Sequence, residues 1–181
     1  MIQEEVTIKS EKIYEGKILN LRIDTIELPD KKYTKREVVE HSGGVGVVAI
    51  TDEDKIVLVK QYRQAISKEM LEIPAGKLEL NEEPRITAIR ELKEETGYST
   101  DNLKYITEFY PTPGYCNEKI HVYMADKLKP GEQDLDEHEY VEVVEMPFDE
   151  AYEKTLNGDI SDAKTIIGIL LAKKEREING W

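Results

Sequence analysis

The chain has little that would place it in an oxidising compartment or a membrane. Cys116 is the only cysteine among 181 residues, so an intrachain disulfide is excluded and a reducing compartment is expected. Its longest apolar run, residues 166–172, is far shorter than the roughly 20 residues of a membrane-spanning helix. The first residues carry no apolar stretch of the kind that directs secretion. We therefore expect a cytoplasmic protein without a membrane partner.

Positive charge is also scarce. The chain has 25 Lys and Arg against 38 Asp and Glu, which gives a formal net charge of -13. Nucleic acids and anionic membranes attract basic surfaces, so we expect no nucleic-acid partner. A small molecule that carries phosphate remains compatible with this charge, provided that local arginines or a divalent cation neutralise it.

The hydrophobic pattern predicts two regions and an α+β fold. Residues 1–41 form a β-rich segment that is too small to bury a good core alone, and residues 42–181 form the main domain. Strands outnumber helices and the two are interspersed, which favours a mixed sheet covered by helices. We expect strands near residues 19–25, 34–41, 45–50, 56–63, 70–73, 105–110, 121–125 and 140–144, and helices at 81–96, 148–157 and 162–174, the last capped by Ser161.

The clearest predicted helix spans residues 81–96. Asn81 is the expected N-cap, and Gly97 suits the position just past the C-terminus. Its apolar side, which we expect to face the core, consists of Ile86, Ala88, Ile89 and Leu92.

A second side of this helix is acidic. Glu91 and Glu95 are neighbours at spacing i, i+4, and Glu94 lies close to both. One interpretation is an ordinary solvated face, which is common in a chain so rich in glutamate. The other is a site for a hard cation, because closely spaced carboxylates with a nearby carbonyl suit magnesium or manganese.

The residues around the helix favour the second interpretation. Gly76 is followed after five residues by Glu82 and after seven more by the run Arg90-Glu91-Leu92-Lys93-Glu94-Glu95-Thr96-Gly97-Tyr98. At every fixed position this stretch, residues 76–98, resembles the signature of the Nudix hydrolases. The resemblance implies an α/β/α sandwich with a mixed β-sheet, to which the N-terminal β segment is added.

The resemblance also implies roles for the residues of the box. Nudix enzymes use divalent metals to hydrolyse a nucleoside diphosphate linked to another group. It implies a metal cluster of Glu91, Glu94 and Glu95, with the carbonyl of Ala75 as a backbone ligand, and two or more ions of magnesium or manganese. Glu82 and Arg90 resemble a structural ion pair that holds the loop to the helix.

Residues outside the box resemble the ADP-ribose pyrophosphatase branch. They are Gln61-Tyr62-Arg63, Glu72-Ile73-Pro74-Ala75-Gly76-Lys77 and Pro113-Gly114. This implies a homodimer that exchanges the N-terminal segment. It also implies substrate contacts from Pro113 and Gly114, from Arg63 to a phosphate, and from Arg36 on the N-terminal strand. Glu72 contacts either the substrate or the box loop.

An acidic loop, Asp134-Leu135-Asp136-Glu137-His138-Glu139-Tyr140, follows. By itself it indicates a solvated loop. In the branch that this chain resembles, a loop here supplies the last metal ligand and the general base. The resemblance implies that Glu139 is the ligand and Glu137 the base, and the two roles could be exchanged.

The implied reaction is hydrolysis of the diphosphate bond of ADP-ribose to AMP and ribose 5-phosphate. Two alternatives remain open. The substrate could be another nucleoside-diphosphate sugar, such as ADP-glucose or GDP-mannose, because the box does not discriminate between them. The chain could also be a module that senses ADP-ribose without cutting it, although such modules usually have eroded box carboxylates.

Overall fold

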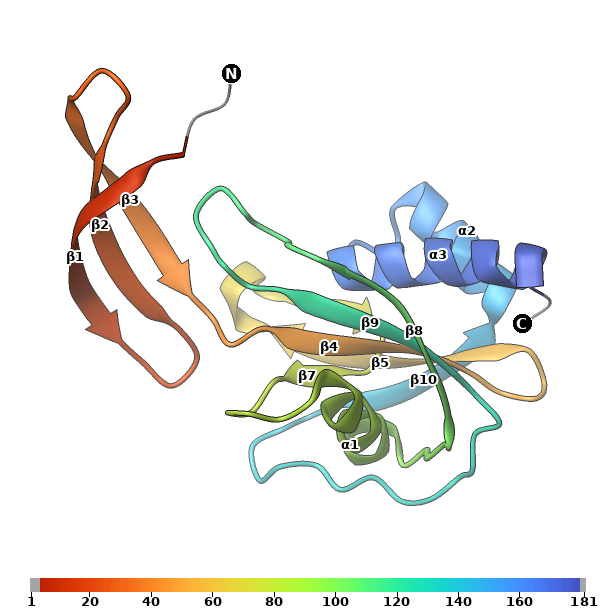
Figure 1. Ribbon diagram of the computed structural model, residues 1–181. Helices are drawn as coiled ribbons and strands as arrows, with labels where there is room; N and C mark the ends of the chain where they lie inside the picture. Colours follow the sequence, from red (N-terminus) through yellow and green to blue (C-terminus); the bar gives the residue numbers. More distant parts are fainter. Residues whose placement is uncertain (1–3, 180–181) are drawn as a thin grey trace. The chain divides into compact units, whose positions relative to one another are not determined.

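The computed structural model describes residues 4–179 (Figure 1). The first three residues of the predicted N-terminal segment and the last two of the predicted main domain lie outside this range. The chain divides into two compact units: residues 1–43 together with 110–119, and residues 44–109 together with 120–181. Between residues 4 and 179, no helix is long and apolar enough to cross a membrane.

The first unit is an antiparallel three-stranded sheet in the order β1-β2-β3. Its strands are β1 (Val6–Glu15), β2 (Asn20–Glu27) and β3 (Tyr33–Glu40). Residues 110–119 join it through a bridge between Val39 and Cys116. The backbone N–H of Val39 donates to the carbonyl of Tyr115 at 2.8 Å. The sequence pattern predicted β2 and β3 but gave no separate strand for β1 within the β-rich segment 1–41.

The second unit is built on a seven-stranded mixed sheet. Its central path has the order β10-β5-β4-β9-β8, while β6 pairs with β5 and β7 with β4. β4 and β9 are parallel, and the other pairs are antiparallel. The strands are β4 (Gly44–Ile50), β5 (Lys55–Arg63), β6 (Lys68–Glu72), β7 (Ala75–Lys77), β8 (Asn102–Phe109), β9 (Ile120–Asp126) and β10 (Glu142–Pro147), with a short 3-10 helix at Gln64–Ile66.

Helices cover both faces of this sheet (Figure 1). Because successive side chains of a strand point to opposite faces, β4 feeds two cores. Val45 and Val47 pack with helix α1 (Pro84–Thr96), whereas Val48 and Ile50 pack with α2 (Phe148–Asn157) and α3 (Ala163–Asn179). This α/β/α sandwich with a mixed sheet confirms the predicted fold class.

Helix α1 begins three residues later than predicted. Its first residue is Pro84, whose missing N–H is tolerated at that position, and the residue before it makes no side-chain cap. Asn81 instead adopts a φ of 64° in the preceding turn, so the predicted N-cap is wrong. Gly97 ends the helix with a φ of 76°, as expected.

The buried face of α1 also differs from the prediction. Ala88 and Leu92 are fully buried, but Ile86 is 54% exposed. The buried stripe continues instead through Glu95 and Thr96, one turn beyond Leu92. The helix therefore turns one of its carboxylates toward the interior.

At the start of α3 the cap is Asp162 rather than the predicted Ser161. The Asp162 carboxylate accepts from the backbone N–H of Thr165 at 2.9 Å, which satisfies a donor of the first turn. Thr165 and Ile169 are fully buried, whereas Leu170 is 39% exposed.

Candidate active site

The acidic side of α1 is organised around one arginine. Arg90 Nη1 donates to Glu91 at 2.8 Å and to Glu94 at 2.7 Å. The same guanidinium reaches Glu82 in the preceding loop, with Nη2 3.2 Å from the carboxylate. The expected ion pair between Arg90 and Glu82 is therefore present. Arg90 also offsets the repulsion between Glu91 and Glu94.

Glu95 lies deeper than the other box carboxylates and is 5% exposed. Its Oε2 accepts from the backbone N–H of Ala75 at 2.8 Å. Burial raises the pKa of the Glu95 carboxyl to about 8, and the charges of Glu91 and Glu139 act in the same direction. Few positive charges compensate this buried carboxylate. A bound cation would supply the missing positive charge.

Gly76 makes room for Glu91. A Cβ atom at Gly76 would lie 1.9 Å from the Glu91 carboxyl carbon, so only glycine allows the carboxylate to rest against strand β7. Burial raises the pKa of Glu91, and the charges of Glu94 and Glu139 add to this, although Arg90 opposes it. The Glu91 carboxylate therefore explains why the pattern has a glycine at position 76.

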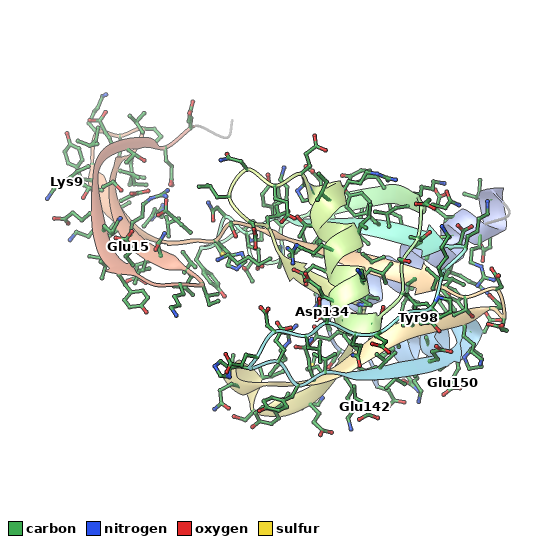
Figure 2. The ribbon with its side chains drawn as sticks, turned by 90° about the horizontal axis from the view of Figure 1, so that it is seen from below. Lys9, Glu15, Tyr98, Asp134, Glu142 and Glu150 are labelled. Carbon is green, nitrogen blue, oxygen red and sulfur yellow. The ribbon has the colours of Figure 1, made fainter. Side chains whose placement is uncertain are left out.

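The acidic loop runs alongside α1. Figure 2 shows Asp134 beside this helix, and its backbone N–H donates to the carbonyl of Glu94 at 3.0 Å. Glu139 lies close enough for its charge to raise the pKa of both Glu91 and Glu95. Glu137 is exposed and, within residues 4–179, makes no hydrogen bond or ion pair with the box. Glu139 is exposed as well and forms no hydrogen bond with the box in the described residues, so only its charge distinguishes it from Glu137.

These groups form a donor set suited to a hard divalent cation. Across residues 4–179, no three His, Cys, Asp or Glu side chains are arranged as a ready-made metal site. The residue types nevertheless fit: Glu91, Glu94 and Glu95 lie within one turn and a half of the same helix, and the pKa values of Glu91 and Glu95 are raised by burial and like charge. Glu91 and Glu94 would exchange contacts with Arg90 for contacts with the ion.

The side chains of Arg63, the last residue of β5, and Glu72, the last residue of β6, form an ion pair. Arg63 Nε and Nη2 each donate to one Glu72 oxygen at 2.7 Å. The Glu72 side chain is 2% exposed and that of Arg63 is 43% exposed. Burial alone would raise the pKa of Glu72, but Arg63 and Lys164 outweigh it and hold the pKa below its usual value. Glu72 thus holds an arginine rather than the box loop.

The other predicted substrate residues belong to the first unit. Arg36, Pro113 and Gly114 line one pocket of about 460 Å³. The exposed rings of Tyr110 and Tyr115 line the same pocket, and Arg36 forms an ion pair with Glu5 at 2.6 Å. The structure therefore collects these three residues around one cavity, and collects the box, Arg63 and Glu72 in the second unit.

Several residues of these sites were not found from the sequence. Tyr110 and Tyr115 could have been suspected, since they flank Pro113 and Gly114. Lys164 gave no signal, because a lysine near a helix start is usually solvated. Gln133, whose side chain donates to the backbone carbonyl of Glu95 at 2.6 Å, gave none either.

Comparisons with families of known proteins cover almost the whole chain. A family model described as the NUDIX domain matches residues 40–167. A second model, described as the nucleoside diphosphate sugar hydrolase N-terminal domain, matches residues 5–39.

Individual relatives match over a similar length. The chain is 47% identical to an ADP-ribose pyrophosphatase of Bacillus subtilis (strain 168) and 46% identical to a methanol dehydrogenase activator of Bacillus methanolicus. Each match covers 92% of this chain and 91% of the relative. It is 37% identical to a GDP-mannose pyrophosphatase of Cronobacter sakazakii over 74% of both chains. A solved ADP compounds hydrolase shares the fold, with a TM-score of 0.87 at 21% identity over 99% of this chain and 98% of that one.

Proposed function

We propose that this chain, which belongs to the Nudix family, is a hydrolase that cleaves the diphosphate bond of ADP-ribose to give AMP and ribose 5-phosphate. The observation that carries the proposal is the complete box, with Glu91, Glu94 and Glu95 gathered at one end of α1. The 47% identity to an ADP-ribose pyrophosphatase over 92% of the chain supports the choice of substrate.

The proposed cofactor is magnesium or manganese, with two or more ions per site. Glu91, Glu94, Glu95 and Glu139 would hold the metal, together with the carbonyl of Ala75. Bound there, a divalent cation would offset the charge of the diphosphate. It would also lower the pKa of a water molecule, which would then lose a proton more readily and attack phosphorus.

The chain's own residues would supply the remaining chemistry. Glu137 would accept the proton of the attacking water while Glu139 serves as a metal ligand, or the two residues would exchange these roles. Arg63 would hold a phosphate and stabilise the charge that develops as the phosphorus–oxygen bond breaks. Water adds across that bond, so AMP and ribose 5-phosphate account for every atom of the substrate.

Base and sugar recognition is assigned to the pocket around Arg36, Pro113 and Gly114. Tyr110 and Tyr115 offer flat faces for stacking, which is worth about 1–3 kcal/mol per base in single-strand binding proteins. The expected homodimer is supported by the exposed apolar side chains of the first unit, and the expected cytoplasmic location by the lone cysteine.

Two other activities have specific support. The similarity to a GDP-mannose pyrophosphatase favours GDP-mannose as the alternative substrate. The 46% identity to a methanol dehydrogenase activator favours a second role, stimulation of such an enzyme. Adding the purified chain to a methanol dehydrogenase and recording the rate tests the latter.

A substrate panel tests the main proposal. The purified chain is incubated with magnesium and, separately, ADP-ribose, ADP-glucose, GDP-mannose, NADH or diadenosine polyphosphates, and products are resolved by anion-exchange chromatography. Fastest turnover of ADP-ribose supports the proposal, whereas fastest turnover of another compound transfers the chemistry to that substrate. Binding of ADP-ribose without cleavage would identify a sensing module instead.

A further inference from the structure

We infer that Lys164, on helix α3, is a positioning residue that prepares Arg63 for a substrate phosphate by sharing the carboxylate of Glu72. The inference rests on the proposed function, because it takes Arg63 to be the phosphate-binding group. Lys164 lies far from the box in sequence, and it contacts none of its carboxylates directly within the described residues.

Lys164 contacts Glu72 directly. The Lys164 ammonium forms an ion pair with Glu72 Oε2 and another with Asp162 at 3.1 Å. The Lys164 side chain is only 13% exposed. A lysine buried to this extent needs its charge compensated, and here two carboxylates do so.

Glu72 also contacts Arg63. Glu72 Oε2 receives both Lys164 and Arg63 Nη2, while Oε1 receives Arg63 Nε. One edge of the guanidinium is thereby fixed, since a bidentate pair restrains both distance and plane. Within residues 4–179, Arg63 Nη1 makes no hydrogen bond, and it remains available for a phosphate oxygen.

Arg63, Glu72, Lys164 and Asp162 form one connected group of charges. Arg63 and Lys164 carry two positive charges, and Glu72 and Asp162 carry two negative charges, so the four side chains sum to zero. Without Lys164 the sum becomes -1, next to the place where an anionic diphosphate must bind. Glu72 would then depend on Arg63 alone, and a phosphate would have to compete with it for the guanidinium.

The position of Lys164 is itself held by its neighbours. Thr165, the next residue, accepts from the backbone N–H of Ile73 at 2.9 Å and donates to Asp162 at 2.6 Å. The first turn of α3 is therefore bound to the residue that follows Glu72. These contacts keep the ammonium over the Glu72 carboxylate.

The first test compares three variants with the parent protein on ADP-ribose. Lys164→Met should lower kcat/KM about tenfold, through a higher KM, a lower kcat or both, because Arg63 is then less well placed for the phosphate while the box is intact. Lys164→Arg keeps the charge and should recover most of the loss. Lys173→Met is the matched control, since Lys173 on the same helix pairs with Asp149 at the surface, and it should leave both constants unchanged.

A double-mutant cycle separates positioning from a merely structural role. If Lys164 acts through Arg63, Lys164→Met should lower kcat/KM much less in an Arg63→Lys background than in the parent. An equal fold-change in both backgrounds would overturn the inference. If the Met variant does not fold, Lys164→Gln replaces it in the same cycle. A parent that does not cleave ADP-ribose refutes the proposed substrate, and the cycle is then run on the substrate that the panel selects.

Discussion

Glu95 is held in the buried stripe of α1, where burial and the charges of Glu91 and Glu139 raise its pKa to about 8. Between pH 4.5 and 8 the folded, metal-free chain binds a proton that the unfolded chain has released, so this group's effect on stability becomes less favourable as pH rises through that window. Glu95→Gln removes the effect and can still accept from Ala75. At pH 7–8 and without metal, we expect it to stabilise the fold by about 1–3 kcal/mol, measured by urea unfolding.

The same substitution should remove catalysis. With magnesium present, Glu95→Gln is expected to lower kcat for ADP-ribose by roughly a hundredfold or more, because a neutral amide replaces a negatively charged metal ligand. Glu153→Gln, an exposed change on α2, is the control for both measurements and should alter neither. Full activity of Glu95→Gln would contradict the assignment of the box carboxylates.

Gly76 gives a second prediction at this scale. An alanine here would put its Cβ into the Glu91 carboxyl, so Gly76→Ala should displace that carboxylate. We expect the magnesium concentration for half-maximal activity to rise about 10–100-fold. Gly114→Ala, where a Cβ meets no atom within 4 Å, is the control for magnesium dependence. Equal magnesium dependence in the Gly76 variant and the parent would show that Glu91 does not need this space.

At the scale of elements, the contact between α3 and the end of β6 supports the site. Thr165→Val keeps the shape of the side chain but leaves the buried N–H of Ile73 without an acceptor. We expect a loss of about 1–3 kcal/mol in the free energy of unfolding. Thr155→Val, which removes only a hydroxyl contact to the preceding turn of α2, should cost much less. Similar losses in the two variants would show that the contact between Thr165 and Ile73 contributes no more to stability than the hydroxyl contact in α2.

The sequence predicted the helices and most strands, because their apolar periodicities are strong. It failed where several local signals compete. Asn81 has the chemistry of a cap, yet Pro84 fixes the first turn and moves the start of α1. The strand β7 has three residues, which is too few for a periodicity. Ile86 looked like a core residue, but the stripe that faces the sheet runs through Leu92 and Glu95 instead.

The site was predicted to a similar extent. The spacing of the box identified Glu91, Glu94 and Glu95 as one group, because they share a short stretch of helix. Long-range contacts gave no such signal. Lys164 meets Glu72 only after α3 folds over the sheet, and Glu72 was equally compatible with the substrate or the loop. The roles of Glu137 and Glu139 stay predictions, although Glu139 is the one whose charge acts on the box.

At the scale of the whole molecule, residues 110–119 join the N-terminal sheet through the Val39–Cys116 bridge. No local sequence pattern predicts a bridge between residues that are so far apart in the chain. The predicted division into residues 1–41 and 42–181 follows the order of the chain alone and stays a prediction.

The proposed homodimer gives a prediction at this scale. Ile8 and Ile13 on β1 are 55% and 54% exposed, and exposed apolar side chains of this kind favour association. We expect sedimentation to give about twice the 20.8 kDa mass of the chain, and Ile8→Lys with Ile13→Lys to shift it toward the monomer. Ile178→Lys, at a site on α3 that is 65% exposed, should leave the mass unchanged. A parent that sediments as a monomer would refute the dimer.

We propose that the clustered carboxylates make this chain a metal-dependent hydrolase of ADP-ribose. The most direct test is the initial rate of AMP and ribose 5-phosphate release from ADP-ribose during a magnesium titration, followed by addition of EDTA. We predict that the two products appear in equal amounts, that the rate saturates with magnesium and that EDTA abolishes it. Unchanged ADP-ribose at every magnesium concentration, or a rate that EDTA does not affect, would contradict the account.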